Sequence, residues 1–144
     1  MADGGKALAG THLRIGWWTV LVFLTLGALL EAFHALKAPL YVDAENETRR
    51  LMWTLAHAHG TLLGLLHIAL AVTLTRLPGW VRSRATASNC LKAATVLLPG
   101  GFFLGGVAVH GGDPGLGIVL VPLGALVLFV SVFQIARAAS RHGE

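Results

Sequence analysis

Residues 53–67 read WTLAHAHGTLLGLLH, and this stretch places three histidines and two glycines in an otherwise apolar segment. Together with the apolar residues that follow it, the stretch is long enough to form a membrane-spanning helix. Ionisable side chains are costly inside such a helix, so they indicate a functional site by default. The histidines His57, His59 and His67 are therefore the first candidates.

The composition of the whole chain is that of an integral membrane protein. Hydrophobic residues make up 55% and charged residues 12% of its 144 residues, which is too apolar and too weakly charged for a soluble domain of this length. Four segments are long enough to span a bilayer, at about residues 14–36, 51–75, 91–109 and 116–136. The sequence therefore predicts an all-α fold, a single domain over residues 1–144 that forms a four-helix membrane bundle.

The charged residues predict how this bundle is oriented. The formal net charge of +4 comes from residues that cluster between the apolar segments, and the connection from Arg76 to Lys92 carries basic residues only. Such a loop is typical of the cytoplasmic side, so we expect both termini inside (N-in, C-in) in a bacterial-type inner membrane. We therefore expect the basic residues to set the orientation of the spans and to contact membrane lipids. No nucleic-acid partner is expected. The single cysteine, Cys90, excludes an internal disulfide.

The predicted topology assigns a depth to each polar residue. The end of the first span, the start of the second and the end of the third should share the outer layer of the membrane. The residues expected there are Glu31, His34, His57, His59, His110 and Asp113. His67 lies about 15 Å further along the second span, near the middle of the membrane. His12 and His142 are assigned to the polar tails, where no role is expected.

Helical phase divides the polar residues of the second span. His57, Gly60, Gly64 and His67 share one face, and His59 points to nearly the opposite side. A small-xxx-small step lets a second helix or a flat ligand approach the backbone. Two interpretations therefore stay open for this face: packing of a helix, or a porphyrin lying on Gly60 and Gly64 with His57 as its axial ligand. His67 either joins that face as part of the cofactor site or bonds a backbone carbonyl of the third span.

Glu31, His34 and Tyr41 are the other candidate site residues. Glu31 and His34 are spaced i, i+3, as in carboxylate-bridged metal bundles, but the spans hold no second carboxylate. Glu31 could instead accept a hydrogen bond from a histidine ring and fix its tautomer, or the two residues could satisfy each other at the interface. Tyr41, in the outer loop, is either a proton donor over a site or an interfacial anchor.

The segment AHAHGTLLG, residues 56–64, resembles the start of the second span in small four-helix membrane isomerases, the styrene oxide isomerases and hydroxylaminobenzene mutases. His57 matches the family histidine and Gly64 the later glycine, whereas Leu63 stands where the family has Asn. The resemblance implies haem b held by His57 in a homo-oligomer. It also implies ferric iron acting as a Lewis acid on an epoxide-like or N-oxygenated apolar substrate.

Because Leu63 replaces the Asn, a polar partner for the substrate must come from elsewhere in the chain. The candidates are Tyr41, Glu31, His34, His67 and His110. Two other functions stay open beside the haem-dependent isomerase. One is a non-enzymatic small subunit or assembly factor whose glycine-rich second and third spans dock on a larger complex. The other is a b-type cytochrome that carries electrons with two histidine ligands.

Overall fold

The computed structural model describes residues 2–42, 47–77 and 79–141, and within these ranges the regular structure is helical apart from one isolated bridge between His110 and Asp113. The elements are α1 (Ala2–Ala35), α2 (Pro39–Val42), α3 (Glu47–Arg76), α4 (Arg84–Val107), the 3-10 helix η2 (Leu116–Val119) and α5 (Leu120–Arg141). The helices α1, α3 and α4, and η2 together with α5, are each long and apolar enough to cross a membrane. The predicted all-α four-helix bundle is confirmed, and its composition marks a multi-pass membrane protein.

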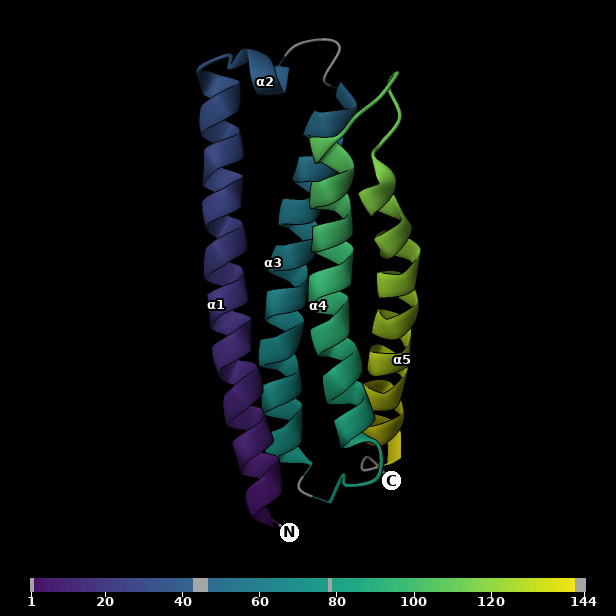
Figure 1. The fold of residues 1–144 in the computed structure, drawn as a ribbon. Coiled ribbons are helices and arrows are strands. Elements are labelled where there is room, and N and C mark those ends of the chain that lie inside the picture. The colour runs from purple at the N-terminus through teal and green to yellow at the C-terminus, as the bar shows by residue number, and fades with distance from the viewer. Residues whose placement is uncertain (1, 43–46, 78, 142–144) are drawn as a thin grey trace.

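The four long helices lie side by side in the order of the sequence. Figure 1 shows α1 next to α3, α3 next to α4, and α4 next to α5, so α1 and α5 occupy the two outer positions. Both chain termini lie at one end of the bundle, which we call the inner end. The α1–α3 connection and the turn after α4 lie at the other, which we call the outer end. The end of α1 and the start of α3, where the sequence placed Glu31, His34 and His57, lie at the outer end.

The first helix begins earlier than the sequence predicted. We expected a polar tail and a span from about residue 14, whereas α1 begins at Ala2. The tail is helical because it packs on the rest of the bundle: Ala9 and His12 are buried, and Gly4 and Gly5 lie against the guanidinium group of Arg84. His142, the other tail histidine, lies outside the described residues.

Small residues bring α1 and α3 close together. A Cβ on Gly64 would lie 2.9 Å from the Val20 nitrogen and 3.0 Å from the Gly16 carbonyl oxygen. A Cβ on Gly16 would in turn lie 2.8 Å from the Gly64 carbonyl oxygen. These neighbours are backbone atoms, which cannot move aside without separating the helices. The contact therefore requires glycine at both positions.

Hydrogen bonds tie the outer end of the bundle together. The Thr48 hydroxyl donates to the Gly112 carbonyl oxygen at 2.5 Å, and Arg49 Nε donates to the Gly106 carbonyl oxygen at 3.0 Å. Trp53 Nε1 donates to the Phe103 carbonyl oxygen at 3.2 Å. The Gly106 carbonyl group lies in the last turn of α4, where it has no intrahelical partner, so the bond from Arg49 satisfies it. The three bonds also fix the start of α3, where the candidate site residues lie.

Candidate functional site

His57 lies on the face of α3 that packs against α1. Its Nδ1 is 2.7 Å from the carbonyl oxygen of Phe23. Because a carbonyl oxygen only accepts, Nδ1 carries the proton and donates, and Nε2 of the neutral ring keeps its lone pair. No hydrogen bond to Nε2 occurs within residues 2–42, 47–77 and 79–141. The ring covers Gly27, where any Cβ would overlap it. A ring fixed through one nitrogen with the other free is the arrangement in which histidine binds metals.

A pocket of about 190 Å³ opens beside His57 between α1, α2 and α3. Glu31, Tyr41 and Thr54 contribute its polar lining, and the remaining lining is apolar. Tyr41 is buried, and its hydroxyl lies 3.4 Å from Thr54 Oγ1. The structure thus brings together His57, Glu31 and Tyr41, which are separated by 10 or more residues in the sequence. We call this the His57 pocket.

His34 lies on the other side of Tyr41. It lines a second, larger pocket of about 560 Å³ at the outer end, which shares Tyr41 and Thr54 with the His57 pocket. The His34 and Tyr41 rings meet edge to face with centroids 6.5 Å apart. An ion pair between Arg50 and Glu47, at 3.7 Å, lies at this pocket. Tyr41 therefore separates the His57 pocket from a polar mouth that contains His34.

The two glycines proposed as a porphyrin surface face α1 instead of an open space. The Phe23 ring occupies the position where a Cβ on Gly60 would lie, and Val20 packs against Gly64. Helix packing, one of the two interpretations left open above, therefore accounts for both glycines. Within one chain His57 fits an axial ligand, but the Gly60 and Gly64 surface does not fit a porphyrin. A cofactor would have to reach Nε2 from the side of the His57 pocket.

His67 belongs to a separate polar cluster in the inner half of the bundle, and its partner is a residue that the sequence analysis missed. Nδ1 of His67 lies 2.6 Å from Nδ1 of His12, and the two rings stack with centroids 4.8 Å apart. His12 Nε2 lies 2.8 Å from Ser88 Oγ, and His67 Nε2 lies 3.0 Å from Thr95 Oγ1. Both histidines are fully buried. Both ring nitrogens of His67 are therefore engaged and hold no position for a cofactor.

One arrangement of protons satisfies this cluster. Thr95 donates its hydroxyl proton to the Leu91 carbonyl oxygen at 2.8 Å, so Thr95 Oγ1 accepts from His67 Nε2. His67 Nδ1 then accepts from His12 Nδ1, and His12 Nε2 accepts from Ser88. Every bond runs in the same direction, and both rings are neutral. This His12–His67 network gives every buried side-chain polar atom in it a partner, as a position away from water requires.

The remaining sequence candidates lie apart from the His57 pocket. His59 points away from α1, as helical phase predicted, and its ring lies 4.8 Å from that of Phe102 on α4. His110 is exposed in the turn after α4, and its Nδ1 bonds the Ala108 carbonyl oxygen at 3.2 Å. Leu63 is almost completely buried in the apolar core. The position at which the family carries an Asn thus offers no polar group here.

The glycines of α4 also pack within the chain. A Cβ on Gly101 would lie 3.1 Å from the Gly117 carbonyl oxygen, and one on Gly106 would meet the Trp53 ring. Gly105 faces Pro114 and Ile118. These glycines therefore serve contacts inside the bundle, and they no longer point to docking on a larger complex.

Comparisons with protein-family models, with curated protein sequences and with solved structures gave no match. Within residues 2–42, 47–77 and 79–141, no three His, Cys, Asp or Glu side chains converge on one point. The chemistry of the chain therefore has to be argued from the His57 pocket itself.

Proposed function

We propose that this chain is a haem-binding membrane protein with His57 as the axial ligand, and that it acts as an isomerase on a small apolar substrate carrying an epoxide or a similar oxygen. The observation that carries the proposal is the bonding of His57. Nδ1 donates to the Phe23 carbonyl oxygen, Nε2 has no hydrogen bond within the described residues, and the ring lines a pocket. The resemblance over residues 56–64 suggests the cofactor and the reaction class.

The residues around the pocket suggest separate tasks. The Phe23 carbonyl oxygen holds the His57 ring in one tautomer and so keeps Nε2 available. The Tyr41 hydroxyl can donate a hydrogen bond to a substrate oxygen. This would replace the polar contact of the family Asn, whose position is occupied by Leu63 in this chain. Glu31 offers a carboxylate that can take up a proton during rearrangement. When bound, haem would supply the Lewis acid that polarises the substrate oxygen.

We further propose that a second copy of the chain completes the site. The His57 pocket, at about 190 Å³, is smaller than the roughly 300–1,000 Å³ of typical small-molecule sites. α1 exposes large apolar residues near the pocket: Leu24, which also lines it, and Leu29, each about half exposed. Packing of this surface against another copy would enclose the open side of the pocket.

The test is the visible spectrum of the protein purified in detergent from cells supplied with haem. We expect a Soret band in the wild-type protein and its loss in His57→Ala. His59→Ala is the matched control, because His59 lies two residues away and also bonds a backbone carbonyl, but faces α4. His67→Ala should keep the band as well. The far-UV circular dichroism spectrum of each variant reports whether it is folded.

Three results would argue against the proposal: an iron-free preparation of the wild-type protein, an unchanged band in His57→Ala, or equal loss in His59→Ala. Addition of carbon monoxide to the reduced protein separates an isomerase from an electron carrier. An immediate spectral shift indicates an open iron position, whereas a second histidine ligand would prevent it. Conversion of an aryl epoxide to the isomeric carbonyl compound should fall with both His57→Ala and Tyr41→Phe.

A further inference from the structure

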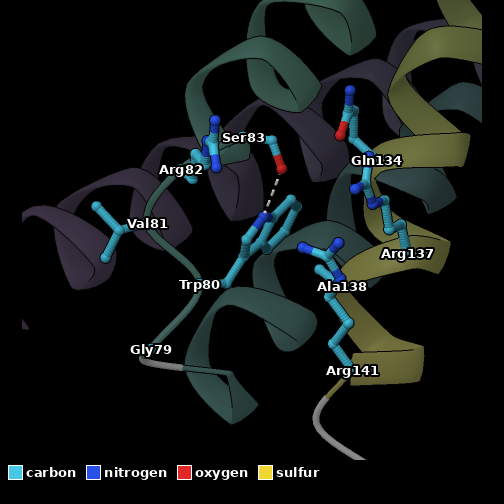
Figure 2. A pocket seen from close by; sticks show the side chains of 9 residues that line it. All are labelled: Gly79, Trp80, Val81, Arg82, Ser83, Gln134, Arg137, Ala138 and Arg141. Atoms are coloured by element: carbon cyan, nitrogen blue, oxygen red, sulfur yellow. Dashed lines mark hydrogen bonds between the residues drawn. The ribbon is translucent and has the colours of Figure 1, made fainter.

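A second pocket, of about 460 Å³, lies at the inner end of the bundle, between the α3–α4 connection and the end of α5. Figure 2 shows the residues of these two segments around the Trp80 ring. The polar and aromatic residues that line it are Trp80, Arg82, Ser83, Gln134, Arg137 and Arg141. We call this the inner pocket. It shares no lining residue with the His57 pocket.

Three arginines give the inner pocket its character. Arg82 comes from the connection, and Arg137 and Arg141 come from one face of α5 at i, i+4 spacing. Within the described ranges, none of the three forms an ion pair with a carboxylate. A guanidinium group offers a planar fork of donors that matches the oxygens of a phosphate group. The inner pocket is therefore positively charged, and its guanidinium donors match an anion with the geometry of a phosphate group.

A fixed aromatic ring forms the base of the pocket. Trp80 is buried, and its Nε1 donates to Ser83 Oγ at 2.9 Å. The dashed line in Figure 2 marks this bond. This bond closes the connection on itself, and Trp80 belongs to the same buried apolar cluster as Ala138 of α5, so Arg82 lies beside the end of α5. Arg82 lines the same pocket as Arg137 and Arg141 because the fold brings the α3–α4 connection beside the end of α5.

An exposed apolar stripe leads away from the arginines along α5. Leu126, Phe129 and Phe133 are 65%, 70% and 52% exposed, and the two rings stack with centroids 6.3 Å apart. Phe133 lies one turn before Arg137, so the stripe ends at the pocket. From Leu126 to Arg137 the helix rises about 16 Å, close to the roughly 15 Å of one leaflet of hydrocarbon. An occupant with an anionic head and a leaflet-length apolar chain fits both features.

We propose that the inner pocket binds the phosphodiester headgroup of an anionic phospholipid, with an acyl chain lying along the Leu126–Phe133 stripe. The guanidinium groups of Arg82, Arg137 and Arg141 donate to the phosphate oxygens, and the Gln134 amide can donate to the glycerol or headgroup oxygens. Inorganic phosphate shares the headgroup chemistry but makes no use of the stripe. Lipid binding should therefore exceed phosphate binding.

The experiment is native mass spectrometry of the delipidated protein in detergent. It is titrated separately with phosphatidylglycerol, with phosphatidylcholine of the same acyl chains, and with inorganic phosphate. We expect phosphatidylglycerol to bind at least about 10-fold more tightly than either of the others, because only it combines a net negative head with a chain. Equal binding of phosphatidylcholine would overturn the role of the arginines. Equal binding of inorganic phosphate would overturn the lipid assignment.

Charge-matched variants test the site itself. Arg82→Gln and Arg84→Gln remove the same charge two residues apart, but the Arg84 guanidinium group lies against Gly4 and Gly5 of α1 and does not line the pocket. Arg82→Gln should weaken phosphatidylglycerol binding about 10-fold, and Arg137→Gln with Arg141→Gln should weaken it further. Arg84→Gln should stay within about two-fold of the wild-type protein.

Equal weakening by Arg82→Gln and Arg84→Gln would show that binding follows overall charge, and would overturn the inner pocket as the site. Size-exclusion elution of each variant reports its fold. If the double variant aggregates, Arg82→Gln and Arg137→Gln as single changes carry the same comparison. Their failure to weaken binding would overturn the proposal as well.

Discussion

Each histidine of the His12–His67 network depends on the other for its hydrogen bond. His12 Nδ1 donates to His67 Nδ1, and Thr95 accepts from His67 Nε2, in a region without access to water. Replacement of one ring leaves partners without a bond. A buried polar group in that state costs about 1–3 kcal/mol. Removal of one member of the network should therefore lower the free energy of unfolding.

We expect His67→Leu to lower the free energy of unfolding by about 1–3 kcal/mol, because it leaves the His12 Nδ1 donor without an acceptor in a buried position. His59→Leu should lower it less, since His59 bonds only a carbonyl of its own helix. Denaturant titration in detergent micelles, followed by circular dichroism, measures both. An equal loss in the two variants would contradict the role of the network.

The double variant His12→Leu/His67→Leu gives a second, independent check. Once both rings are gone, neither leaves an unsatisfied nitrogen, so the double variant should be less destabilised than the sum of the two single variants. The four unfolding free energies form a thermodynamic cycle. Strict additivity would mean that the two rings do not stabilise each other.

The residues that share one face of α3 could be predicted from the sequence, but the side chains that pack against this face could not. Helical phase correctly placed His57, Gly60, Gly64 and His67 on one face of α3, because the phase of a regular helix follows from residue number alone. The same reasoning could not say that Phe23 and Val20 would fill the space above the glycines. That depends on the register of α1, which is set by contacts between segments far apart in the sequence.

At the level of elements, the interface between α1 and α3 depends on atoms that cannot move. A Cβ on Gly64 would meet backbone atoms of Val20 and Gly16, whereas a Cβ on Gly100 of α4 would meet nothing within 4 Å outside its own helix. Both glycines lie inside helices. Substitution of each by alanine therefore compares the effect of one added methyl group at a tightly packed position and at an open one.

We expect Gly64→Ala to destabilise the protein by about 1–3 kcal/mol through overpacking. Gly100→Ala should be neutral or stabilising by up to about 1 kcal/mol, because alanine is the better helix former. Thermal unfolding of the two variants in the same detergent tests the difference. A stable Gly64→Ala variant would mean that α1 and α3 are not in the close contact described above.

The first helix shows what the apolar pattern alone missed. The apolar run begins near residue 14, so the sequence predicted that the span starts there, yet α1 begins at Ala2. Had the helix been extended backward, His12, Gly16, Val20, Phe23 and Gly27 would have fallen on one face at helical spacing. This face is the one that packs on α3. The signal was therefore present, but the polar composition of residues 1–12 concealed it.

For the whole molecule, the even number of long helices places both ends of the chain at the inner end (Figure 1). The basic connection and the arginines of the inner pocket lie at this end too. By the positive-inside rule we expect this end to face the cytoplasm. Fold class and the number of spans follow from length and composition, whereas which helices lie side by side comes from the structure.

Cysteine labelling tests the orientation. In a Cys90→Ser background, a membrane-impermeant maleimide should label Glu47→Cys in intact cells, and it should label Arg141→Cys only after permeabilisation. Both positions are exposed, at opposite ends of the bundle. The reverse pattern would contradict the N-in, C-in topology, and it would place the inner pocket in the other leaflet.

The His12–His67 network has one more consequence, for the register of the helices. Its last acceptor, the Leu91 carbonyl oxygen, cannot donate, so the chain of bonds cannot reverse its direction. A slide of α1 along α3 by one turn, about 5.4 Å, would break the bond between the rings and leave both unsatisfied. Gly27 lies about 22 Å further along the same helix. The network near the inner end thereby fixes the alignment that seats the His57 ring on Gly27 near the outer end.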